Sequence, residues 1–170
     1  LRGAWPILAR VAPVKFVIPA LLADRLPGEL GIAAERFIPV DDGQTVEVAG
    51  VRITGVAAAH ERLNPDPATG RHPCLGFVVE AGGIRLYHAG DSCVYEGLLT
   101  RLRRARPDVM IVPINGRDAR RLASGCIGNM TFQEAVDLVG ETGPGLAIPA
   151  HYDMFEGNTA DPQLFLDYLR

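Results

Sequence analysis

Long apolar runs and paired cysteines are missing from this 170-residue sequence, and each absence excludes a class of protein. No apolar run approaches the roughly 20 residues that a membrane span requires, so no membrane contact is expected. Cys74, Cys93 and Cys126 are odd in number and far apart, and none belongs to a Cys-x-x-Cys pair. This spacing argues against a cysteine-bound zinc or a redox pair, and it favours free thiols in a reducing, cytoplasmic compartment.

Positive charge is not in excess either. The chain has 17 basic and 20 acidic side chains, a formal net charge of −3 with neutral histidines. It therefore lacks the basic face typical of nucleic-acid binding, and no nucleic-acid partner is expected. A hydrophobic content of 48% disfavours disorder. A chain of this length buries about 68–70% of its unfolded surface, so we expect one domain over residues 1–170.

Glycine and proline, with 19 and 13 copies, divide the chain into short segments of strand-like or helical apolar spacing. Strands are predicted at 15–19, 108–113 and 146–150, and hairpins at 46–54 and 75–88. Helices are predicted from Ala20 to near Pro27, over 94–106, from the capping box at Thr131 to Gly140, and from Asp161 onward. The strand-rich first half and the β-α-β-α second half predict an α/β sandwich with helices packed on sheet faces.

Three polar residues each follow the carboxyl end of an apolar strand. His60 follows Ala57-Ala58-Ala59, Asp91 follows 86–90, and His151 follows Ile148-Pro149-Ala150. Ligand and metal sites of α/β proteins are usually built at that edge of the sheet. Two imidazoles and a carboxylate suit zinc, manganese or iron. Either histidine alone is better explained as a half-buried structural side chain, but three such residues together favour a metal site.

Four motifs occur in an order that resembles the metallo-β-lactamase superfamily. They are Tyr-His-Ala-Gly-Asp-Ser at 87–92, Ile-Val-Pro-Ile-Asn-Gly at 111–116, Ile-Pro-Ala-His-Tyr-Asp-Met-Phe at 148–155 and Asn-Thr-Ala-Asp-Pro at 158–162. Within the superfamily they are most similar to the branch that contains L-ascorbate-6-phosphate lactonase. The similarity runs from about Phe16 to the end of the sequence.

The resemblance implies a four-layer αββα sandwich and a divalent metal, manganese or zinc, with one or two ions in the intact protein. It implies that His60, Asp91 and His151 are metal ligands, with Asp91 bridging, and that Asp91 and His151 are catalytic. The implied reaction is attack by a metal-activated hydroxide on a lactone, ester or phosphoester. The expected partner is a small molecule such as a sugar phosphate or lactone, and a homo-oligomer is left open.

The superfamily's His-x-His-x-Asp-His motif is absent. The histidines are His60, His72, His88 and His151, and no two are separated by a single residue. We therefore expect a C-terminal portion of such a hydrolase, with the N-terminal part of the fold missing. The alternative is a non-catalytic scaffold that binds a small ligand or pairs with a separate N-terminal piece. Exposed strand edges and an uncovered sheet face would then be expected.

Several neighbours of these residues have two interpretations. His88, Asn115, Asp153 and Asn158 either orient the metal ligands or substrate, or only pack and cap turns. His72 is interpreted as a surface loop residue, with a substrate contact as the alternative.

Two further features have a less favoured functional alternative. The arginines at 101, 103 and 104 are interpreted as a solvated face rather than a phosphate site. Cys93 permits a Cys-His nucleophile, but no local signature favours an activated thiolate.

Overall fold

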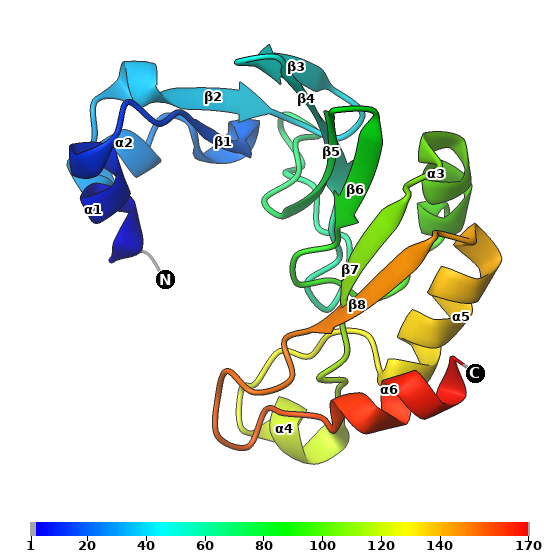
Figure 1. Cartoon of the computed structure of the whole chain (residues 1–170). Helices are drawn as coiled ribbons and strands as arrows, with labels where there is room; N and C mark the ends of the chain where they lie inside the picture. Colours follow the sequence, from blue (N-terminus) through cyan, green and yellow to red (C-terminus); the bar gives the residue numbers. More distant parts are fainter. Residues whose placement is uncertain (1–2, 170) are drawn as a thin grey trace.

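A six-stranded mixed sheet is the body of the structure, a computed structural model that describes residues 3–169 (Figure 1). Its order is β3 (Thr45–Val48), β4 (Val51–Ala57), β5 (Leu75–Ala81), β6 (Ile84–His88), β7 (Val109–Pro113) and β8 (Leu146–Ala150). Pairing is antiparallel from β3 to β6 and parallel from β6 to β8. The carboxyl ends of β6, β7 and β8 therefore meet at one edge of the sheet.

Both predicted hairpins are confirmed. Ala49 and Gly50 join β3 to β4 with φ of 51° and 78°, and Gly82 and Gly83 join β5 to β6 with φ of 56° and 81°. Two consecutive positive φ values match the right-handed twist of the strands, which is why glycine is favoured in these turns.

Helices α3 (Leu98–Ala105), α5 (Phe132–Thr142) and α6 (Pro162–Tyr168) cover one face of the sheet (Figure 1). The main core lies between them and includes Tyr87, Leu102, Met110 and Phe165. The predicted capping box at Thr131 and the Asp161 cap of α6 are both present. The predicted α/β layering is thus confirmed.

The opposite face of the sheet carries an apolar row that crosses all six strands. Side chains alternate between the two faces along a strand, and Met110 belongs to the core on the helical face. Its neighbour Val109 and the residues in register with Val109 therefore share the opposite face. In strand order they are Val46, Ile53, Val79, Leu86, Val109 and Leu146. The row is only partly buried, and its last member is 52% exposed.

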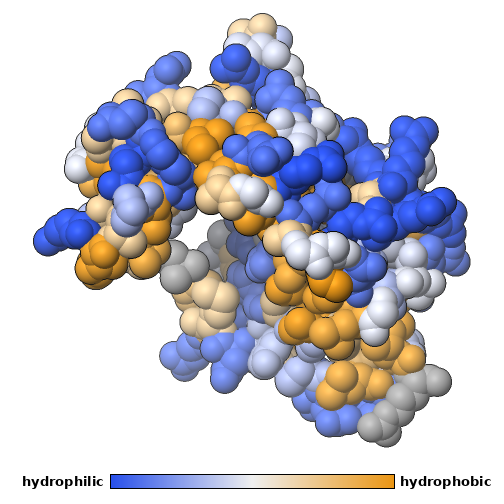
Figure 2. Space-filling model, turned by 45° about the horizontal axis from the view of Figure 1, so that its top comes forward, coloured by the Kyte–Doolittle hydropathy of each residue, from blue (hydrophilic) through white to orange (hydrophobic). Residues whose placement is uncertain are grey.

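A smaller second sheet belongs to the N-terminal segment. Strands β1 (Phe16–Pro19) and β2 (Phe37–Val40) pair in parallel, with α1 (Ala4–Val11), α2 (Leu26–Leu30) and two short 3₁₀ turns at 20–22 and 34–36. Trp5 stacks on Phe16 with ring centroids 5.1 Å apart, beside a separate apolar cluster around Ile18 and Phe37. In Figure 2 a hollow separates this segment, at the left, from the lower body, with apolar side chains on both.

Two predicted helix boundaries are wrong. Pro27 lies in the first turn of α2 rather than at the end of a helix. Proline fits there because it has no backbone N–H to donate, and the N–H groups of the first turn have no partner within the helix. The predicted 94–106 helix begins at Leu98, since Gly97 precedes it with a φ of 92°. Across residues 3–169, every helix is too short or too polar to span a membrane.

Candidate metal centre

His60, Asp91 and His151 come together at the carboxyl edge of the sheet. Asp91 Oδ2 lies 3.9 Å from His60 Nε2, and Asp91 Oδ1 lies 3.5 Å from His151 Nε2. Each carboxylate oxygen thus faces a different imidazole. The Asp91 side chain is 46% exposed and the His151 side chain 12% exposed, so the group opens to solvent on the side of the carboxylate.

The backbone beside two of these residues adopts an unusual conformation. His151 has a φ of 57° and Glu61, directly after His60, has a φ of 74°. L-residues avoid this left-handed region because Cβ crowds the backbone. At the third position Gly90 provides a φ of 63° just before Asp91. A residue with positive φ therefore lies at or directly beside each of the three candidate ligands, and the chain turns sharply there.

The donors fit a divalent cation in type and spacing. Two ligand atoms each about 2.1 Å from one tetrahedral ion lie about 3.4 Å apart, close to both N···O separations here. The set is incomplete, however, because residues 3–169 contain no group of three His, Cys, Asp or Glu side chains that could hold a metal ion. His151 Nδ1 is also buried without a hydrogen-bond partner among these residues. The described part of the chain thus supplies one imidazole and one carboxylate oxygen at each of two positions.

Of the four neighbours singled out from the sequence, His88, Asn115 and Asn158 make hydrogen bonds, whereas Asp153 makes none within the described part of the chain. His88 Nδ1 accepts a 2.9 Å hydrogen bond from the Gly90 N–H and so joins the turn before Asp91, and partial desolvation lowers the pKa of His88. The Asn115 amide nitrogen donates to Asn158 Oδ1 at 2.9 Å. Asp153 is exposed, and its side chain makes no hydrogen bond or ion pair with any residue from 3 to 169.

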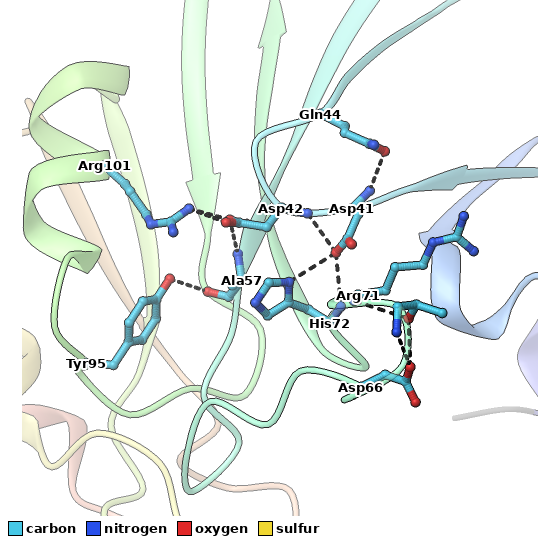
Figure 3. A network of polar contacts seen from close by, with 10 residues as sticks. Asp41, Asp42, Gln44, Ala57, Asp66, Arg71, His72, Tyr95 and Arg101 are labelled. Carbon is cyan, nitrogen blue, oxygen red and sulfur yellow. Dashed lines mark hydrogen bonds and ion pairs between the residues drawn. The ribbon is translucent and has the colours of Figure 1, made fainter.

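His72 is not the exposed loop residue that the sequence predicts. Its Nδ1 lies 3.2 Å from Asp41 Oδ1, and both side chains are largely buried (Figure 3). In the same view Arg101 binds Asp42, whose Oδ1 also accepts from the Ala57 N–H at 2.8 Å. This network joins the segment after β2 to β4 and α3, and it does not include the candidate ligands.

The remaining alternatives gain no support from their contacts. Arg101 and Arg103 are engaged by Asp42 and Glu141, which favours a structural role over a phosphate site. The Cys93 thiol is buried, and burial raises its pKa, which keeps it protonated and a poor nucleophile. Burial, assisted by the negative charge of Asp91, likewise raises the pKa of Cys74.

Periodicity and spacing assign no role to three further residues, namely Ser92, Asn129 and Arg121. Ser92 and Asn129 are buried, and Arg121 Nη1 donates to the Asn115 carbonyl at 2.6 Å and to Asn158 Oδ1 at 3.0 Å. Their contacts join residues many positions apart, and no periodicity reports such contacts.

Comparison with known proteins gives consistent matches. A family model described as a beta-lactamase superfamily domain matches residues 3–152. A UPF0173 metal-dependent hydrolase of Thermoplasma acidophilum is 29% identical over 147 residues, which cover 86% of this chain and 60% of that protein. One of Saccharolobus solfataricus is 35% identical over 86 residues, or 51% of this chain and 35% of that protein.

Solved structures show the same fold. The metallo hydrolase Igni18 from Ignicoccus hospitalis superposes with a TM-score of 0.73 at 22% identity, over 98% of this chain and 65% of that one. The isothiocyanate hydrolase from Delia radicum gut bacteria superposes with a TM-score of 0.67 at 13% identity, over 95% and 64%. This chain therefore spans about 60% of the length of the Thermoplasma relative and less than two thirds of the length of each of the two solved structures.

Proposed function

Because the chain belongs to the metallo-β-lactamase superfamily, we propose that it forms part of a metal-dependent hydrolase with His60, Asp91 and His151 among its metal ligands. The observation that carries the proposal is the Asp91 carboxylate, whose two oxygens face different imidazoles at 3.9 and 3.5 Å. The relatives' names, metal-dependent hydrolase, support the same reaction class.

The chain's own residues have defined tasks in this proposal. Asp91 and His151 are the proposed catalytic pair, since the carboxylate is open to solvent while the imidazole, 12% exposed, is largely shielded from it. His60 Nε2 faces the other oxygen of the carboxylate at 3.9 Å, where it is the proposed imidazole donor of the second position. A divalent cation, manganese or zinc, would supply a nucleophilic water at neutral pH and polarise the substrate.

The substrate class is the finer part of the proposal. The motifs at 87–92, 111–116 and 148–155 support a lactonase-like enzyme acting on a lactone, ester or phosphoester, such as a sugar phosphate. A small molecule is the proposed partner, because the net charge of −3 offers no attraction for nucleic acid. The unpaired thiols support a cytoplasmic location.

The test measures metal content by mass spectrometry, together with hydrolysis of lactone, ester and phosphodiester panels, on the protein expressed from its complete coding sequence. We expect stoichiometric transition metal and chelator-sensitive turnover. Asp91→Asn should lower both metal content and turnover by 100-fold or more, on the order of the loss of a bridging ligand. Asp137→Asn, an exposed acid on α5, should change neither. Absence of metal from the wild-type protein would refute the proposal.

The partly exposed apolar row favours a second candidate, a non-catalytic scaffold that pairs with a separate polypeptide. A row across all six strands is typical of a sheet face that packs against another layer. Size-exclusion chromatography, together with the metal measurement above, distinguishes the two proposed functions. A monomer that tightly holds a stoichiometric metal excludes the scaffold.

A further inference from the structure

Three buried polar side chains of the described residues lie close together. Ser92, Asn115 and Asn129 are each at most 2% exposed, and they are distinct from Tyr87, whose buried hydroxyl lies in the main core. A buried polar group costs free energy unless it is hydrogen-bonded, so such groups occur where their bonds serve a purpose. All three lie behind the strand ends that carry His60, Asp91 and His151.

The first link ties the His60 turn to the Asp91 turn. The Ala59 N–H donates to Ser92 Oγ at 3.0 Å, and Ser92 Oγ donates to the Cys93 carbonyl at 2.8 Å. The Cys93 N–H donates to the Ala59 carbonyl at 2.8 Å. The residue before His60 and the residue after Asp91 are therefore held together by a side chain and a backbone bridge.

The second link runs from the Asp91 turn to the segment after β7. The Met130 N–H donates to the Ser92 carbonyl at 3.0 Å, and the Gly116 N–H donates to the Met130 carbonyl at 2.9 Å. Beside them the Asn129 amide nitrogen donates to Asn115 Oδ1 at 3.0 Å. Asn115 is thereby fixed in register with the segment that contacts Ser92.

The third link reaches the loop that begins at His151. Asn158 Oδ1 accepts from the Asn115 amide at 2.9 Å and from Arg121 Nη1 at 3.0 Å. Arg121 also donates through Nη1 to the Asn115 carbonyl at 2.6 Å and through Nε to Asp118 Oδ2 at 2.6 Å. The Arg121 guanidinium, which belongs to α4 (Ala119–Ala123), thus joins the His151 loop to the segment that follows β7.

We propose that Ser92, Asn115 and Arg121 are positioning residues that hold the three candidate ligands at their mutual separations. This inference rests on the proposed function, in which His60, Asp91 and His151 bind metal. Metal affinity depends on ligands that are already in place, and residues that orient ligands typically contribute 10–100-fold to it. The network supplies that constraint because it joins all three ligand-bearing turns through consecutive hydrogen bonds.

The test is Zn²⁺ binding to the protein expressed from its complete coding sequence, measured by competition with a chromophoric chelator. Ser92→Ala, Asn115→Ala and Arg121→Leu should each raise the Zn²⁺ Kd by about 10–100-fold. The visible spectrum of the Co²⁺-substituted protein should change with them, because it reports ligand geometry. Ser92→Thr, which retains the hydroxyl, should restore affinity, whereas Arg121→Lys should not, since lysine lacks the fork that spans two acceptors.

Asp108→Ala is the matched structural control. Asp108 Oδ2 accepts from the Arg85 N–H at 2.7 Å and cross-links β6 and β7 at the opposite end of the sheet. Its loss should lower the stability of the metal-free protein and leave the Zn²⁺ Kd and the Co²⁺ spectrum unchanged. If Asn115→Ala fails to fold, the partly exposed Arg121 keeps the comparison available through Arg121→Leu.

The possible failures are distinguishable. A wild-type protein that binds no Zn²⁺ overturns the proposed function and this inference with it. A wild-type protein that binds Zn²⁺ tightly, with network variants that match it in Kd and spectrum, overturns the positioning role alone. Equal effects of Asp108→Ala and Asn115→Ala on Kd also overturn it, because the effect would then follow stability rather than the network.

Discussion

Replacing Glu134 by glutamine should destabilise the protein by about 1 kcal/mol at neutral pH and leave it unchanged in acid. Glu134 Oε2 accepts from the Thr131 N–H at 2.9 Å, and both carboxylate oxygens accept from Arg117 at 2.6 Å. The Glu134 N–H in turn donates to Thr131 Oγ1 at 3.3 Å. The charge therefore sits in a capping box, at the positive end of the α5 dipole, and in a two-point ion pair.

The magnitude follows from these surroundings. An exposed ion pair contributes about 0.2–1 kcal/mol, and an acid at a helix N-terminus about 0.3–1 kcal/mol. The Glu134 and Arg117 side chains are 33% and 42% exposed, so the sum is reduced by solvent screening to about 1 kcal/mol. Glutamine retains an oxygen for the Thr131 N–H, so the cap itself is largely preserved.

The pH dependence has a definite sign. Hydrogen bonds from Arg117 lower the pKa of Glu134 below its ordinary value of 4.5. The stabilisation is therefore complete above that value and is lost as the pH falls through the lowered folded-state pKa. Well below it, the wild-type protein carries a neutral carboxyl and should match the glutamine variant.

Urea unfolding at neutral pH and at successively lower pH follows the difference in the free energy of unfolding between the two proteins through this titration. Glu141→Gln is the control, since Glu141 lies in the last turn of the same helix, pairs with Arg103 and is 60% exposed. Its loss should change the free energy of unfolding by less than about 0.5 kcal/mol, because the helix dipole there disfavours an acid. Equal losses for both variants, or a Glu134 effect that persists in acid, would refute the reasoning.

Two further predictions concern packing. Phe165→Ala should cost about 3–5 kcal/mol in urea unfolding because the ring is fully buried in the main core, whereas Leu166→Ala, at an exposed position, should cost little. Gly140→Ala should raise the free energy of unfolding by about 0.5–1 kcal/mol, since a Cβ there meets nothing within 4 Å and alanine favours the helix. Gly128→Ala should instead lower it by about 1–3 kcal/mol, because its Cβ would lie 2.2 Å from Arg117 Cβ.

The elements that sequence predicts correctly are those with a local physical signature. The turn at Gly82 and Gly83 requires positive φ, and both residues have it. Thr131 and Glu134 form the reciprocal cap that their spacing predicts. Each ligand candidate could be placed at the carboxyl end of a strand because each follows an apolar run, and they meet at one edge because β4, β6 and β8 run in the same direction.

The parts that sequence misses depend on contacts between distant segments. Helix α4 is not among the helices predicted from the sequence, and Asp118 caps it by accepting from the Arg121 N–H at 2.9 Å. Ser92 and Asn129 show no pattern, since a single buried serine or asparagine looks like any turn residue until its partners are known. The prediction for Pro27 is wrong because a proline can either begin a helix or end one, and in α2 it lies in the first turn.

Backbone strain and polar burial both concentrate at the candidate metal centre, and the coincidence needs an explanation. Among residues 3–169, the non-glycine residues with positive φ are Ala49, Glu61, Arg106 and His151. Ala49 forms a hairpin turn and Arg106 ends a helix, so local geometry accounts for both. Glu61 and His151 have no such local cause and adjoin or belong to the candidate ligands. A fold selected for stability alone would relax both turns. Their strain lies at the edge of the sheet where the hydrogen bonds of Ser92, Asn115 and Arg121 join the ligand-bearing turns, as a preorganised site requires.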